Sequence, residues 1–161
     1  MTKVRRRVVR EKVIQALYAH EISRDSVEHV ILHNLAGLKR SKDAHDFARQ
    51  LVETTVEHEE SIDRIIKAKV ANWDFSRLAV LDRLILRMAI CELLHFKEIP
   101  PKVSMDEAIE LAKLFSTEKS GQFVNGILDA VLNDLKASGD LAKEGRGLWS
   151  GSAPKQRKES V

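Results

Sequence analysis

The chain has 161 residues, 43% of them hydrophobic, and a net charge of +3 that is unevenly distributed. Residues 1–12 contain six Lys or Arg and one Glu, and residues 136–161 contain six bases and three acids, whereas residues 13–135 contain 15 bases and 20 acids. A single cysteine excludes an internal disulfide, and no apolar run is long enough to cross a bilayer. Glu11, Lys12 and His20 interrupt any signal-peptide core, so we expect a single-domain, soluble cytoplasmic protein.

The first half of the chain is expected to form three helices. Leu, Ile, Val and Ala are plentiful and Gly and Pro are scarce, which predicts an all-helical fold. Hydrophobic periodicity predicts helices over residues 5–22, 26–36 and 43–70. Asp25 or Ser26 is expected to begin the second of them.

A break over residues 72–76 precedes a central helix, predicted over residues 77–96. This helix is apolar nearly all the way round, as expected for an element surrounded by others. Ser76 is a plausible N-cap for it. We expect Pro100 and Pro101 to exclude helix from the connection that follows.

Two capping signals predict the remaining helices. Ser104 and Glu107 have the spacing of a capping box, which would begin a helix that reaches Phe115. Thr117 is expected to cap the last helix. After Ser138 little is left to bury, so we predict a helical domain over residues 1–138 and a basic, disordered tail over residues 139–161.

Signals for catalysis, cofactors or metals are weak. Cys91 and His95 lie one turn apart, but the simpler interpretation is a buried thiol beside a histidine at a helix end, because no third orienting group is evident. His29 and His33 share a helix face but lack the further ligands of a metal motif. We therefore predict no active site, no metal and no cofactor.

The first helix carries a distinctive polar face. Arg7, Glu11, Gln15 and Tyr18 fall within one arc of roughly 80° on a helical wheel. A guanidinium fork, hydrogen-bonding groups and a stacking ring are suited to unpaired RNA. An ordinary solvated helix face would show the same pattern, and the residues alone do not decide between the two interpretations.

Several charged residues outside this face have more than one interpretation. Arg10 falls at the border of the apolar face, which predicts an inward ion pair. Asp82 and Glu92 lie on the most apolar side of the central helix, where carboxylates are either paired inside or exposed to a partner, and for Glu92 we favour pairing. Lys97 and Lys102 flank the prolines and would either contact phosphates or solubilise a loop.

The sequence resembles the NusB family of bacterial transcription antitermination factors. The resemblance covers about residues 5–136 and rests on a set of short motifs: Arg6-Arg7, Arg10-Glu11, Gln15-Ala16-Leu17-Tyr18, Leu86-Arg87-Met88-Ala89, Glu92-Leu93, Ile99-Pro100, Asp106 to Lys113, and Phe123 to Asp129. It implies two packed helical bundles, about six to seven helices in all, and no catalytic activity. It also implies binding of boxA, a single-stranded element of ribosomal RNA leader transcripts, together with the small-subunit ribosomal protein NusE, to help RNA polymerase pass terminators.

By motif position, the resemblance nominates five RNA-side residues on the first helix: Arg6, Arg7, Arg10, Gln15 and Tyr18. The basic pattern adds Arg5, which is extra relative to the family's cluster, and Lys102 beside the prolines. Asp82 takes a place near the RNA and partner surface, although its side chain is shorter than the family's glutamate. The tail after Ser138 has no counterpart in the resemblance.

The sequence is also compatible with two other functional interpretations. A helical scaffold that binds only proteins would use the basic N-terminus for solubility and would show no RNA sequence preference. A homodimer would bury the same arginine surface.

Overall fold

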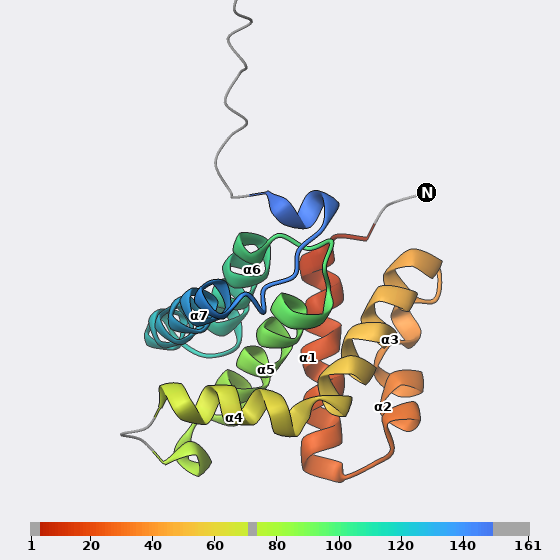
Figure 1. Cartoon of the computed structure of the whole chain (residues 1–161). Helices are drawn as coiled ribbons and strands as arrows, with labels where there is room; N and C mark the ends of the chain where they lie inside the picture. The colour runs from red at the N-terminus through yellow and green to blue at the C-terminus, as the bar shows by residue number, and fades with distance from the viewer. Residues whose placement is uncertain (1–3, 71–73, 150–161) are drawn as a thin grey trace, which may run out of the picture.

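The arginine-rich segment begins α1 (Arg6–Ser23) in a computed structural model that describes residues 4–70 and 74–149 (Figure 1). One face of α1 is buried, through Val9, Val13, Ile14, Ala16 and Leu17. It packs against α2 (Val27–Asn34) and α3 (Lys42–Glu57). Ser26 caps α2 by accepting a hydrogen bond from the His29 N–H, so the predicted cap is confirmed.

The long helix predicted over residues 43–70 is two helices, and this prediction was wrong. The chain leaves helical geometry at His58, with φ −102° and ψ 16°, and α4 (Glu59–Lys69) begins at the next residue. The two helices have different partners, because α3 packs on α1 and α5 whereas α4 packs on α5 and α7. The break therefore allows α3 to pack on α1 while α4, the next helix in the chain, packs on α7.

The central helix is α5 (Val80–His95), which begins later than predicted. Ser76 is not its N-cap, because Ser76 lies in a short 3₁₀ helix, η2 (Phe75–Arg77), and donates to Asp74. As predicted, α5 is buried almost all round and touches α1, α3, α4, α6 and α7. Figure 1 shows α1, α2 and α3 on one side of α5 and α6 and α7 on the other.

The two prolines begin a helix rather than exclude it. Pro100 is the N-cap of α6 (Pro101–Phe115), and Pro101 occupies the first helical position, where a missing N–H removes no hydrogen bond. The expected capping box was therefore wrong, and Ser104 is a buried residue inside α6. Thr117 caps α7 (Glu118–Ser138) by accepting from the Ser120 N–H, as predicted.

Residues 139–149, the first part of the predicted tail, contact the end of α5 in the structure. A further 3₁₀ helix, η3 (Gly145–Leu148), follows α7, and the Lys143 ammonium donates to the carbonyls of Glu92 (3.0 Å) and Phe96 (2.9 Å). A cation placed on carbonyls at the end of α5 satisfies acceptors that the helix itself leaves unpaired. Residues 150–161, the rest of the predicted tail, lie outside the described residues.

The predicted all-helical class with two packed bundles is confirmed. The described residues form seven α-helices and no strand, and short 3₁₀ segments, including η1 (Ala36–Leu38), connect them. Within the same residues, no helix is long and apolar enough to cross a bilayer.

Candidate nucleic-acid interface

Exposed cations gather where α1 and α6 begin. We call this surface the cationic edge and define it by Arg5, Arg6 and Arg7 with Lys102 in the first turn of α6. All four side chains are exposed. Lys102 lies almost 100 residues from the arginines in the sequence, but the starts of α1 and α6 are close in the fold, because Arg7 is hydrogen-bonded to Glu107 on α6 and Arg6 lines one cavity with Pro100 and Val103.

Arg6 is held in place by an aromatic ring. Its guanidinium lies 3.7 Å from the centroid of the Phe47 ring and 3.6 Å from Asp43 Oδ2. The contact between the guanidinium and the ring limits the conformations of the Arg6 side chain, and it leaves the N–H donors of the guanidinium free to bind an anion. Asp43 is 81% exposed, so its attraction for Arg6 is screened by water. Arg6 is thereby oriented and still open to an anion.

Arg7 is not a free phosphate ligand. Its Nε and Nη2 donate to the two carboxylate oxygens of Glu107 on α6, at 3.0 and 3.1 Å. These hydrogen bonds, with the attraction of the carboxylate, raise the pKa of Arg7. The side chain remains 50% exposed, so its outer surface can still attract a phosphate while the fork fixes its direction.

Arg10 lies inside, as the position on the helical wheel predicted. It is 2% exposed and donates to Glu92 on α5, at 3.0 Å from Nε and 2.6 Å from Nη2, while Ser104 donates to the same carboxylate at 3.0 Å. Burial opposes the charge of Arg10, but the charge and hydrogen bonds of Glu92 outweigh burial and raise its pKa. The assignment of Arg10 to the RNA side does not fit this geometry, because its donors face α5.

Gln15 and Tyr18 extend the exposed face of α1 away from the arginines. Both are exposed, Tyr18 to 43%. From Arg7 to Tyr18 the helix rises about 16 Å, which is long enough for several nucleotides of a single strand. The face that the sequence predicted is therefore present on the surface, and Glu11 within it is half-buried.

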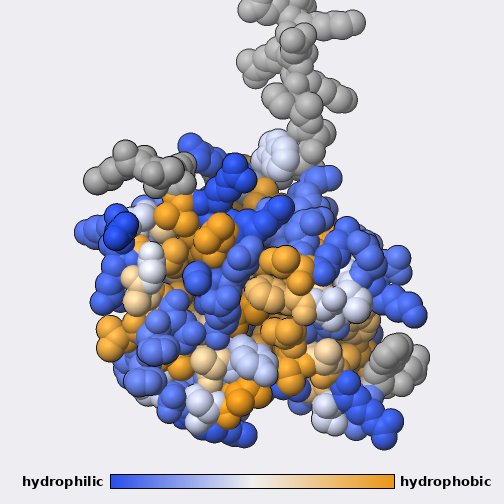
Figure 2. Space-filling view, turned by 180° about the vertical axis from the view of Figure 1, so that it is seen from behind, coloured by the Kyte–Doolittle hydropathy of each residue, from blue (hydrophilic) through white to orange (hydrophobic). Residues whose placement is uncertain are grey.

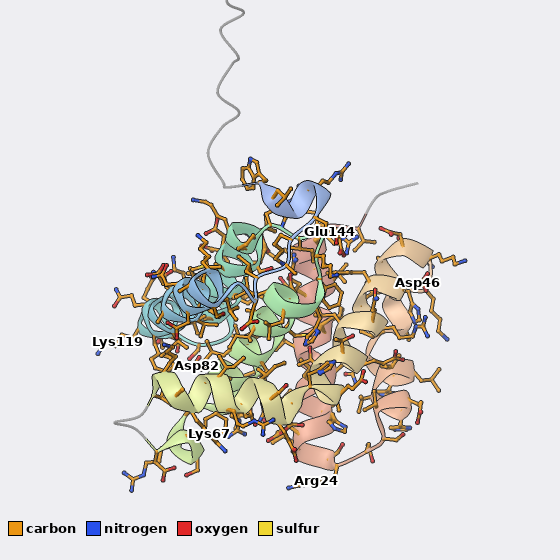
Figure 3. All side chains as sticks on the ribbon, in the orientation of Figure 1. Arg24, Asp46, Lys67, Asp82, Lys119 and Glu144 are labelled. Carbon is orange, nitrogen blue, oxygen red and sulfur yellow. The ribbon has the colours of Figure 1, made fainter. Side chains whose placement is uncertain are left out.

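Asp82 belongs to a different surface. It is 7% exposed at the start of α5, accepts a hydrogen bond from Ser120 at 3.2 Å, and has an Oδ1 without a partner among the described residues. Burial raises the pKa of this carboxyl, and the Ser120 hydrogen bond opposes that rise. Figure 3 shows Asp82 well below Glu144, whose N–H donates to the Lys97 carbonyl just after the end of α5. The structure therefore does not bring Asp82 to the cationic edge.

Two residues that the sequence did not single out lie beside the cationic edge. Arg146 and Trp149, both exposed, line a cavity of about 620 Å³ together with Arg6. The signal available in the sequence was a Leu148-Trp149 pair inside a stretch otherwise poor in apolar residues. Such a pair indicates a segment with something to bury or to bind.

The thiol of Cys91 is expected to be unreactive in the folded protein. Cys91 is completely buried, and burial raises its pKa to about 12. Because the thiolate is the reactive form, iodoacetamide at pH 8 should modify it more than about a hundredfold more slowly than in urea. Modification at the same rate in both conditions would contradict this assignment. No group of three or more metal-ligating side chains occurs in residues 4–70 and 74–149.

The described residues define an all-helical protein with exposed cations at one edge, a surface that would attract a polyanion. The chain matches the model of the NusB family over residues 7–133, and it belongs to that family.

Individual relatives agree with this assignment. A transcription antitermination protein NusB from Salinibacter ruber is 48% identical over 145 residues, which cover 89% of this chain and 90% of that protein. The structure of T. maritima NusB has a TM-score of 0.77 at 40% identity and covers 83% of this chain and 94% of its own. A structure of the antitermination factors NusB and NusE in complex with dsRNA has a TM-score of 0.73 at 29% identity, covering 80% and 96%.

Proposed function

We propose that this protein is a transcription antitermination factor that binds boxA RNA of ribosomal RNA leader transcripts. It acts in the cytoplasm with NusE, within an antitermination complex of RNA polymerase, and without catalysis. The observation that carries the proposal is the cationic edge, whose arginines are oriented by Phe47 and Glu107 in a chain of the NusB family. The NusB of the complex named above was crystallised with NusE and dsRNA.

Each part of the surface has a separate role in this proposal. Arg5, Arg6 and Lys102 contact phosphates and position the RNA, whereas Gln15 and Tyr18 contact unpaired bases. A handful of phosphate contacts gives modest affinity that falls steeply with salt. NusE adds a second RNA-contacting surface and raises affinity through effective concentration. Asp82, whose Oδ1 has no hydrogen-bond partner within residues 4–70 and 74–149, is assigned to a partner contact away from the cationic edge.

Arg6→Ala with Arg7→Ala is expected to weaken binding of a boxA oligonucleotide. In single-stranded RNA each lost phosphate contact lowers the slope of log affinity against log salt by about 0.7, so loss of the Arg6 contact should lower the slope by about that amount. Fluorescence anisotropy at several salt concentrations measures both quantities. Arg64→Ala with Lys67→Ala is a matched control, because both residues are exposed on α4 and two charges are again removed.

Three outcomes bear on the proposal. Equal losses in the two double variants would mean that overall charge, not the cationic edge, governs binding. Unchanged binding of the arginine variant would remove the proposed interface. A wild-type protein that binds boxA and a scrambled RNA equally, with or without NusE, would favour the protein-binding scaffold.

A further inference from the structure

The segment after α7, residues 139–149, lies beside the cationic edge, where Arg146 and Trp149 line a cavity with Arg6. It lies beyond residues 7–133, which match the family. The Glu144 N–H donates to the Lys97 carbonyl at 2.9 Å, and Gly147 packs so tightly that a Cβ there would collide with the same carbonyl. Together with the Lys143 hydrogen bonds, these contacts fix the backbone of the segment on the end of α5. Arg146 and Trp149 therefore have positions set by the fold.

These two residues line an open cavity that has both apolar and charged groups. The cavity of about 620 Å³ lies between the start of α1, the connection from α5 to α6, and η3. Its apolar side is formed by Ile99, Pro100 and Val103. Its charged groups are the exposed guanidiniums of Arg6 and Arg146 and the carboxylate of Glu98. The Arg10 guanidinium also lines the cavity, but it is already paired with Glu92. A volume of this size is typical of sites that hold a small molecule or one unit of a polymer.

We propose that this cavity binds one unpaired nucleotide of an RNA strand that follows the cationic edge. The base stacks on Trp149 and the phosphate lies between Arg6 and Arg146. The inference rests on the proposed function and adds to it a nucleotide site supplied by the segment after α7. The site would lengthen the RNA footprint beyond α1.

Three observations favour a nucleotide over another occupant. Trp149 is 44% exposed and lines the cavity together with Ile99, Pro100 and Val103, so a planar base there would cover apolar surface that water now contacts. Arg146 forms no ion pair within residues 4–70 and 74–149, and Arg6 has only the solvated Asp43, so both cations are available to a phosphate. Arg6 belongs both to the cavity and to the cationic edge, which makes the two surfaces continuous. Figure 2 shows strongly hydrophilic side chains next to hydrophobic surface on the upper part of the molecule.

The test uses the intrinsic fluorescence of Trp149. The chain has two tryptophans, so Trp73→Phe leaves Trp149 as the only indole. In this background, boxA RNA is expected to quench Trp149 emission on binding. Trp149→Ala should lower the affinity for RNA about tenfold, as for the loss of one stacked base, whereas Trp149→Phe should retain most of it.

Arg146→Ala provides a second, independent variant, because the side chain is exposed and its loss leaves the backbone contacts of the segment intact. We expect its salt slope to fall by about 0.7. Leu114→Ala, which removes an exposed apolar side chain at the far end of α6, is the control and should bind as the wild type does. Circular dichroism and thermal melting establish that each variant is folded.

The results separate this inference from the proposed function. If the wild type fails to prefer boxA over scrambled RNA, the proposed function fails. A second outcome overturns only the nucleotide site. In that outcome the wild type prefers boxA and the double variant Arg6→Ala with Arg7→Ala binds it more weakly. However, RNA does not quench Trp149 emission, and neither Trp149→Ala nor Arg146→Ala changes the affinity for RNA. If Trp149→Ala and Arg146→Ala leave RNA affinity unchanged but lower the affinity for NusE measured in the absence of RNA, the cavity is a protein contact and the inference is wrong.

Discussion

Glu92→Ala is expected to lower the free energy of unfolding by about 3–5 kcal/mol, because it leaves a buried arginine without its carboxylate. Arg10 is 2% exposed and directs two hydrogen bonds to Glu92, which is itself fully buried. Ser104 loses its acceptor in the same variant. Urea unfolding followed by circular dichroism measures the change.

The double variant Arg10→Met with Glu92→Met tests the physical reason. It removes both charges and fills the space with side chains of similar volume, so the double variant should be more stable than Glu92→Ala. If the single variant loses less than about 1 kcal/mol, the pair is not the buried contact described above. The pair also joins the start of α1 to α5, so Glu92→Ala should weaken RNA binding indirectly by loosening the base of the cationic edge.

Arg87→Ala is expected to lower the free energy of unfolding by a similar amount, about 3–5 kcal/mol. Arg87 on α5 is 5% exposed, and it donates to both oxygens of Asp63 on α4, at 2.7 and 2.8 Å. It also lies 3.4 Å from Glu21 on α1 and 3.2 Å from Glu59 on α4. Burial opposes its charge, and the hydrogen bonds and charges of these carboxylates more than compensate, which raises the pKa of Arg87.

Two further variants sharpen this prediction. Arg87→Lys keeps the charge but loses the planar fork, so its stability should lie between those of the wild type and Arg87→Ala. Arg64→Ala removes an exposed arginine from α4 and should change stability by less than about 0.5 kcal/mol. A loss in Arg87→Ala no larger than in Arg64→Ala would contradict the structural role of the cluster. Because the cluster lies away from the cationic edge, RNA affinity of the folded Arg87→Lys variant should be unchanged.

Much of the fold could be predicted from local patterns. Apolar residues that recur every three or four positions indicated the helices, and Ser26 and Thr117 marked two helix starts through side chains that cap nearby N–H groups. The same periodicity placed Arg10 on the border of the apolar face and so predicted its inward pairing. The exposed face of Gln15 and Tyr18 followed from the helical wheel as well.

Helix boundaries were less predictable wherever packing overrode a local signal. His58 ends α3 because the chain has to pass from the surface of α1 to that of α7. Ser104 has the spacing of a capping residue, yet its hydroxyl serves the buried Glu92 carboxylate. Pro101 predicts a break in the helix, but it occupies the first turn of α6, where a helix tolerates proline.

The sequence by itself determined the all-helical class, the arginine-rich start and the amphipathic face of α1, because each depends on residues within a few positions of one another. Only the tertiary structure decided which arginine and lysine side chains remain exposed to bind a partner and which are paired within the protein. Arg7 meets Glu107 across 100 residues of chain and Arg10 meets Glu92 across 82, and Lys143 anchors its segment on carbonyls that lie 47 and 51 residues away. Helical periodicity carries no information over such separations, since these contacts depend on how whole helices pack around α5.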